Sequence, residues 1–60
     1  MALSELERRV IQNQIETLDA RSRQLRAKME RGEELSDKER VELSALVDRI
    51  QSLVALLERG

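Results

Sequence analysis

The chain has 60 residues and contains no cysteine, histidine, proline, phenylalanine, tyrosine or tryptophan. This composition excludes disulfides, thiolate and imidazole metal ligands, and the common general bases and nucleophiles, so we expect no enzyme, cofactor or metal site. Eleven basic against 12 acidic residues give a net charge of −1, which excludes steering by bulk charge toward DNA or an anionic membrane.

The N-terminus does not resemble a signal peptide, because Met1 to Ser4 lead directly into charged residues. The longest apolar run, Leu53–Leu57, is far shorter than the ~20 residues of a membrane-spanning helix. We therefore expect a cytoplasmic protein without membrane contact.

A first helix is predicted over about residues 3–31, because nearly all of these residues are good helix formers. Its apolar positions recur at helical spacing and comprise Leu3, Leu6, Val10, Ile11, Ile15, Leu18, Leu25 and Met29. Arg26, Lys28 and Arg31 place positive charge near its C-terminal end, where the helix dipole favours it.

A turn is predicted over about residues 32–36. Gly32 is the only internal glycine and stands where a left-handed C-terminal cap is expected. Ser36 and Glu39 have the spacing of a capping box, in which each side chain bonds the backbone amide of the other. A hydrophobic staple across this cap is expected between Leu35 before it and Arg40 or Val41 after it, with Val41 the better candidate.

The second helix is predicted over about residues 37–58. Its apolar residues fill positions a, d and e of successive heptads, which is the broad stripe of a bundle helix. These residues are Leu43, Leu46, Val47, Ile50, Leu53, Val54 and Leu57. The whole chain, residues 1–60, is therefore predicted to be one all-α domain, an antiparallel two-helix hairpin.

Folding back at the turn pairs positions whose numbers sum to roughly 68. This register brings Arg26 near Glu42, and Arg31 near Asp37 and Glu39. It also leaves the first helix overhanging by about two turns, or ~10 Å, so that its first apolar residues need a second molecule.

Self-association is the expected solution, since so short a chain rarely stabilises itself alone. We predict a homodimer that forms a four-helix bundle, although a trimer or tetramer would cover the same stripe. The predicted interface residues are Leu3, Leu6, Val10, Ile11, Ile15, Leu18, Leu46, Leu53 and Leu57.

A basic cluster in the first helix is the candidate contact for another partner, either protein or nucleic acid. It comprises Arg21, Arg23, Arg26 and Lys28. These side chains spread around the helix and no aromatic residue is present to stack on bases, so a solvated face is favoured over a nucleic-acid site.

Three polar residues, Asn13, Gln14 and Ser22, lie on or beside the apolar stripe. A polar residue at such a position can select register and oligomeric state. For Ser22 we expect the simpler role, in which the hydroxyl bonds a carbonyl one turn earlier. Such irregularities are uncommon in idealised designs, which favours a natural protein over a purely structural, designed bundle.

These features predict a small non-enzymatic, self-associating protein–protein interaction module, acting as a regulator, adaptor, inhibitor or co-chaperone. In architecture the predicted hairpin dimer resembles the plasmid copy-number regulator Rop, which implies RNA binding as the alternative. It also resembles the small co-chaperones of type III secretion, which pair with a partner subunit.

Overall fold

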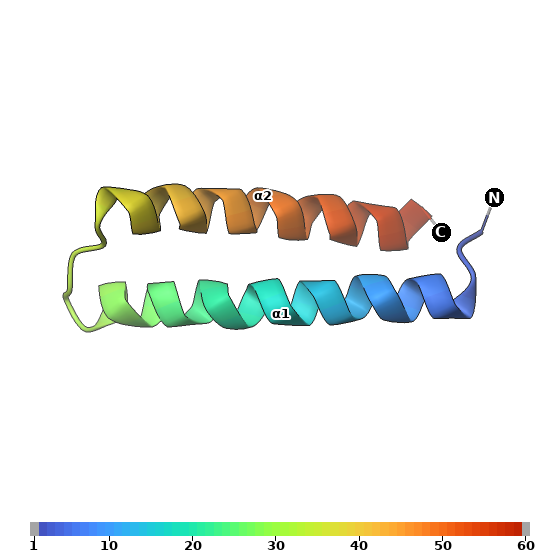
Figure 1. Cartoon of the computed structure of the whole chain (residues 1–60), viewed down its shortest axis with the longest axis horizontal. Helices are drawn as coiled ribbons and strands as arrows, with labels where there is room; N and C mark the ends of the chain where they lie inside the picture. Colours follow the sequence, from blue (N-terminus) through green and yellow to red (C-terminus); the bar gives the residue numbers. More distant parts are fainter. Residues whose placement is uncertain (1, 60) are drawn as a thin grey trace.

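The computed structural model describes residues 2–59 as two α-helices joined by a short connection. Helix α1 spans Glu5–Glu30 and helix α2 spans Asp37–Arg59. The helices are antiparallel and pack against each other side by side (Figure 1). This arrangement confirms the predicted all-α hairpin. Among the described residues, neither helix is apolar over a long enough stretch to cross a membrane.

Helix α1 begins two residues later than predicted because Ser4 caps it. The Ser4 hydroxyl accepts a hydrogen bond from the Glu7 amide at 3.1 Å, and the Ser4 amide donates to the Glu7 carboxylate at 3.0 Å. These reciprocal bonds form a capping box, which satisfies two amides at the helix start. The Ser-x-x-Glu spacing at the start of α2 therefore also occurs at the start of α1. It locates the first residue of the helix, which the apolar periodicity does not.

The connection opens with a Schellman motif at the C-terminal end of α1. The Gly32 amide donates to the Met29 carbonyl at 3.0 Å, and the Glu33 amide donates to the Lys28 carbonyl at 3.0 Å. Gly32 has a φ of +82°, a left-handed conformation that costs other residues roughly 1–2 kcal/mol. The predicted glycine cap is confirmed.

Helix α2 begins with the predicted capping box. The Glu39 amide donates to the Ser36 hydroxyl at 3.1 Å, and the Ser36 amide donates to the Glu39 carboxylate at 3.0 Å. The predicted staple is wrong, because Val41 is 71% exposed. Val41 lies about 120° around α2 from the buried Leu53 and so points away from α1. Leu35 is buried without it.

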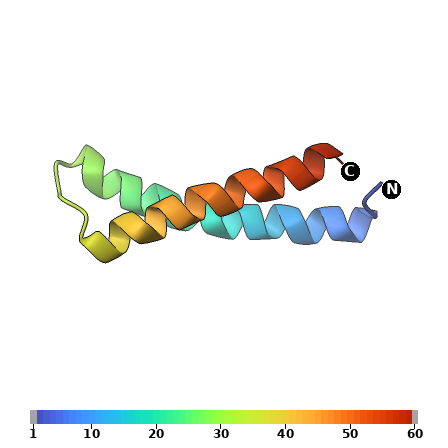
Figure 2. The same cartoon turned by 90° about the horizontal axis from the view of Figure 1, so that it is seen from above.

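Burial is confined to a narrow seam between the helices, which cross obliquely when seen from above (Figure 2). Leu25 in α1 is fully buried, Leu53 in α2 is 7% exposed, and Leu35 in the connection is also 7% exposed. The apolar residues that flank the seam are only half-buried: Ile11, Ile15, Leu18, Leu43, Leu46, Val47, Ile50 and Leu57. The described chain thus buries few hydrophobic side chains by itself.

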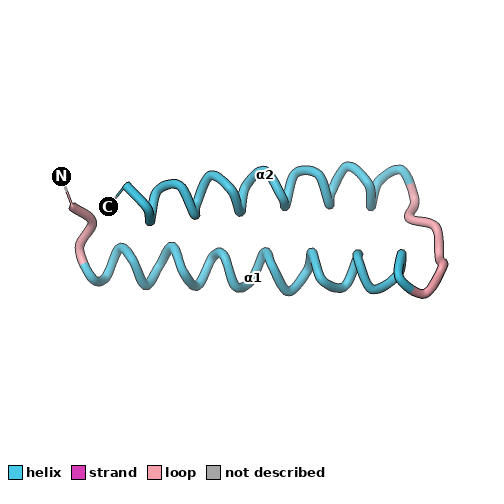
Figure 3. Tube along the Cα trace, turned by 180° about the vertical axis from the view of Figure 1, so that it is seen from behind, coloured by secondary structure: helices cyan, strands magenta, loops and turns pink. Residues whose placement is uncertain are grey.

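The hairpin is a rod of 44 × 14 × 14 Å. Its radius of gyration is 13.8 Å, whereas a compact chain of this length has about 10 Å. Its accessible surface of 4843 Å² exceeds the ~4,000 Å² expected for a compact chain of this mass by about 800 Å². Each helix has only the other as a neighbour along its length (Figure 3), which explains this surplus.

The overhang of the first helix is smaller than predicted. Helix α1 has 26 residues and α2 has 23, a difference of less than one helical turn. The start of α1 still extends beyond the end of α2 (Figure 1). Near this start Leu6 is 72% exposed, and Val10, which lies beside α2 but points to the same side as Arg21, is 50% exposed. The capped start at Ser4 and the longer α2 account for the change.

Ser22 is a buried polar residue without a bonding partner. Its side chain is fully buried, and its hydroxyl makes no hydrogen bond within the described part of the chain. The predicted bond to a carbonyl one turn earlier is therefore wrong. Thr17, on an exposed part of the same helix, does make such a bond, to the Asn13 carbonyl at 3.0 Å. Close packing against α2 favours a small side chain at position 22, but its hydroxyl remains unsatisfied.

Replacing Ser22 by alanine should therefore stabilise the hairpin. The change removes an unpaired buried hydroxyl, and we expect the free energy of unfolding to rise by roughly 1 kcal/mol in urea titrations. Ser52→Ala, at an exposed position of α2, is the matched control because it makes the same gain in helix propensity. Equal effects of the two substitutions would contradict a burial penalty at Ser22.

Candidate interaction surface

A bidentate ion pair joins the two helices on one side of the hairpin. Arg21 Nε and a terminal guanidinium nitrogen each donate to a different oxygen of Glu42, both at 2.9 Å. The other terminal guanidinium nitrogen donates to the Gln24 side-chain oxygen at 3.3 Å. The planar guanidinium matches a carboxylate in this geometry, which fixes the register of the helices more firmly than a point charge can. The hydrogen bond with Arg21 lowers the pKa of Glu42.

A second ion pair lies nearer the turn, where Lys28 Nζ donates to Glu39 at 2.7 Å. Glu39 is the more enclosed partner, with its side chain 20% exposed against 40% for Lys28. Hydrogen bonds from Lys28 and from the Ser36 amide lower the pKa of Glu39 to about 2. One carboxylate therefore both caps α2 and links it to α1. We call the side that carries Arg21, Lys28, Glu39 and Glu42 the ion-pair edge.

The predicted ion-pair partners are wrong in detail. Glu42 pairs with Arg21 and not with Arg26, which lies more than one turn further along α1. Arg31 pairs with Glu33 at 2.7 Å within the connection, so Glu39 is left to Lys28. The reason is reach, because long flexible side chains can select partners a turn away from the position directly opposite them.

The four cations predicted as partner contacts are not gathered on one surface. Arg21 and Lys28 are bound to glutamates of α2, and Arg23 pairs with Asp19 of its own helix at 2.9 Å. Among residues 2–59, Arg26 alone of the four makes no ion pair. It lies about 140° around α1 from Arg21, on the opposite side of the hairpin.

The side opposite the ion-pair edge is apolar. Val47 lies about 140° around α2 from Glu42, just as Arg26 lies about 140° around α1 from Arg21. Because Arg21 and Glu42 are bonded to each other on the ion-pair edge, Val47 and Arg26 share the opposite side. We call this side the apolar face and define it by Met29, Leu43, Val47, Ile50 and Val54. Met29 is 47% exposed, Val54 is 37% exposed, and the other three residues are half-buried. The side chains line one side of the seam along most of α2.

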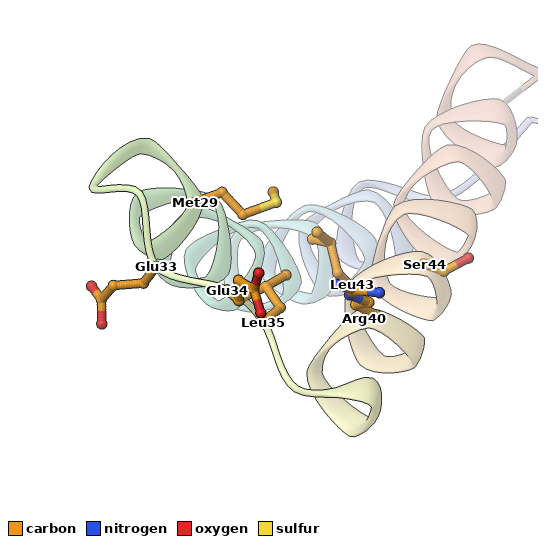
Figure 4. Close-up of a pocket in the computed structure, with 7 residues that line it drawn as sticks. All are labelled: Met29, Glu33, Glu34, Leu35, Arg40, Leu43 and Ser44. Atoms are coloured by element: carbon orange, nitrogen blue, oxygen red, sulfur yellow. The ribbon is translucent and has the colours of Figure 1, made fainter.

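A shallow groove ends the apolar face beside the turn (Figure 4). Met29, Leu35 and Leu43 supply its apolar walls. Polar side chains complete the lining: Glu33, Glu34, Arg40 and Ser44. Met29 comes from α1, Leu35 from the connection and Leu43 from α2, so the groove exists only where the two helices and the turn meet. An apolar side chain with a neighbouring carboxylate fits this combination of apolar walls and Arg40.

The predicted interface residues fall into two groups. Most lie in the seam of the hairpin itself, half-buried or, for Leu53, buried: Ile11, Ile15, Leu18, Leu46, Leu53 and Leu57. Leu3 is half-buried before α1, whereas Leu6 and Val10 are exposed. Val10 lies within about 20° of Arg21 around α1 and so points toward the ion-pair edge, and Leu6 is one turn before it. Leu6 and Val10 therefore do not belong to the apolar face. The sequence signal for the apolar face was the breadth of the apolar stripe on α2, which includes heptad position e as well as positions a and d.

The described residues contain no group of three or more acidic side chains arranged to hold a metal ion. Comparison of the chain with protein families, curated proteins and solved structures found no match. The geometry of the hairpin is therefore the basis for its proposed function.

The ion-pair edge predicts a loss of stability in acid. Glu39 stays ionised in the folded hairpin down to about pH 2, whereas the unfolded chain binds this proton near the ordinary value of 4.5. Its interactions therefore stabilise the fold above pH 4.5, and this contribution is lost as the pH falls toward 2. Urea titrations from about pH 6 to about pH 2.5 should show the loss in the wild type and a flatter dependence in Glu39→Gln.

Glu16→Gln is the control for this titration, because Glu16 is exposed and makes no ion pair among the described residues. It should follow the wild-type curve. If Glu39→Gln also follows that curve, the ion pair with Lys28 does not contribute to folding.

Proposed function

We propose that this chain is a non-enzymatic protein–protein interaction module that self-associates through its apolar face into a four-helix bundle. The observation that carries the proposal is the asymmetry of the hairpin. Charged side chains pair with each other on one side, and a continuous row of apolar side chains stays partly exposed on the other. Such rows in small proteins mark contact surfaces for other chains.

The amounts of surface support a dimer. The hairpin exposes about 800 Å² more than a compact chain of its mass. Each partner in a standard protein interface buries roughly 800 Å². A second hairpin on the apolar face would remove part of this extra surface from water. It also completes the burial of the seam residues, which one hairpin leaves half-covered.

A further protein partner has a separate surface available at the start of α1. Leu6 and Val10 are 72% and 50% exposed and lie toward the ion-pair edge. A second hairpin on the apolar face leaves them uncovered. An amphipathic helix of another protein can pack on them in the manner of a regulator, adaptor, inhibitor or co-chaperone.

RNA binding is the weaker alternative. Arg21, Arg23 and Lys28 already have carboxylate partners within the hairpin, so contact with phosphates requires these ion pairs to break. The gain from neutralising the nucleic-acid backbone is reduced by that cost. Of the four cations, Arg26 is left without an ion-pair partner in the described hairpin and lies beside apolar residues, which suits the rim of a protein interface.

A charge placed in the apolar face tests self-association. Val47→Asp puts a carboxylate at the centre of the proposed interface, and we expect the dimer to weaken more than about 100-fold. Sedimentation at micromolar concentration should give a dimer for the wild type and a monomer, or a largely unfolded chain, for the variant.

Val41→Asp is the matched control, because Val41 is 71% exposed on the outward side of α2. It makes the same substitution in the same helix and should remain dimeric. A wild-type chain that is helical and monomeric at these concentrations contradicts the proposal, as does equal weakening by the two substitutions.

A further inference from the structure

We infer that the ion-pair edge binds an amphipathic helix of another protein, which packs apolar side chains on the open end of the hairpin and places a carboxylate on Arg49. This inference rests on the proposed interaction function and names the chemistry of its further partner. It follows from an exposed apolar cluster and an uncompensated cation that lie on the same side of the hairpin.

The apolar cluster lies at the open end, where the start of α1 is beside the end of α2 (Figure 1). Val10 lies about 20° around α1 from Arg21, and Leu56 lies about 40° around α2 from Glu42, so both point toward the ion-pair edge. Leu6 is one turn before Val10. Leu6, Val10 and Leu56 are 72%, 50% and 44% exposed, and we call them the end cluster. The hairpin by itself leaves all three uncovered.

Two adjoining hollows lie between the helices on the same edge, nearer the middle of the hairpin. The first is lined by Gln14, Thr17, Leu18 and Arg49. The second shares Leu18 and Arg49 and is completed by Glu42, Ala45 and Leu46. Both hollows are thus parts of one groove between α1 and α2. A groove between two packed helices is a surface on which a third helix packs, because its side chains enter the spaces between theirs.

The end cluster and Arg49 are about two helical turns apart. Leu56 follows Arg49 by seven residues on α2, or ~10 Å, and both side chains point to the same side. Val10 is at nearly the same level as Leu56, because Arg49 lies opposite the turn between Gln14 and Leu18. A helix in the groove therefore needs its apolar residues and its charged residue about seven positions apart.

The charge that the groove presents is positive. Arg49 makes no ion pair among the described residues. The carboxylate that shares its hollow, Glu42, already has both oxygens bonded to Arg21 at 2.9 Å. Arg59 lines a hollow beside Leu56 at the end of α2 and has the same sign as Arg49.

The other carboxylates of this half of the hairpin do not compensate Arg49. Three are bonded elsewhere, to Arg9, to the Ser4 amide and to Arg23, and these are Glu5, Glu7 and Asp19. Three others lie at least about 100° around their helices from Arg49 or Gln14, and these are Glu16, Asp48 and Glu58. A carboxylate supplied by the partner is therefore the complementary charge.

The groove stays accessible when the apolar face is covered. Val47, in the middle of the apolar face, lies about 160° around α2 from Arg49. A second hairpin on the apolar face therefore leaves Arg49 and the end cluster open to another protein.

Peptide selection tests the chemistry of the partner. A displayed library of helical peptides with randomised surface positions is selected for binding to the full chain. We expect enriched peptides to carry two apolar residues three or four positions apart, and Asp or Glu about seven positions from the nearer one. Enrichment without this acidic preference, or no enrichment at all, overturns the inference.

The role of Arg49 is tested with one enriched peptide, synthesised and measured by fluorescence anisotropy. Arg49→Glu should weaken binding roughly tenfold or more, and exchanging the acidic residue of the peptide for lysine should restore it. Arg23→Glu is the matched control, because its side chain is 78% exposed and points away from the groove. Equal weakening by both substitutions, or no recovery with the lysine peptide, contradicts the inference.

The failure of self-association is a different result. Leu56→Asp should abolish peptide binding and leave the oligomeric state measured by sedimentation unchanged. Loss of the dimer in this variant would show that a second copy occupies the edge, and would overturn the inference. A wild-type monomer that binds the peptide contradicts only the proposed self-association.

Discussion

Two helices packed side by side cover each other along a single seam, and this limit governs the rest of the molecule. Each helix presents a broad apolar stripe, but its neighbour shields only the middle of it. Leu25 and Leu53 are therefore buried, while Val54 and Met29 remain 37% and 47% exposed. A short chain that has no cysteine, and no metal-binding group among its described residues, has few other internal means of covering this surface. The exposed part of the stripe is the surface on which we propose that a partner packs.

The charged residues give the hairpin its sidedness. Arg21 with Glu42 and Lys28 with Glu39 occupy one side, where Glu39 also caps α2. Exposed ion pairs of this kind add little stability individually, but their geometry fixes how the helices are rotated relative to each other. That rotation directs Val47 and Val54 to the opposite side. The specificity of the proposed dimer therefore derives from charges and its strength from apolar contacts.

The local structure was predictable because it depends on residues near each other in sequence. Gly32 and the pair Ser36 and Glu39 determine the turn and the start of α2, and Ser4 with Glu7 carries the same signal for α1. The register between helices was less predictable. Arg21, and not Arg26, reaches Glu42. The sequence pattern does not decide between these two arginines, because a long side chain can adopt several rotamers that reach different residues of the other helix.

The candidate surface was predictable only in part, for a similar reason. Apolar periodicity identifies the stripe, but it does not separate the residues that pack within the hairpin from those left for another chain. The unpaired hydroxyl of Ser22 and the outward position of Val41 depend on the rotation of the helices, which only the assembled structure reveals.

The proposal that a second chain covers the apolar face is tested most directly by the concentration dependence of unfolding. If the apolar face is covered by another copy, association and folding are linked, and a hundredfold increase in protein concentration should raise the thermal midpoint measured by circular dichroism by about 10 °C. A midpoint that stays constant over the same range, with full helix content at the lowest concentration, would show that the single hairpin is stable alone.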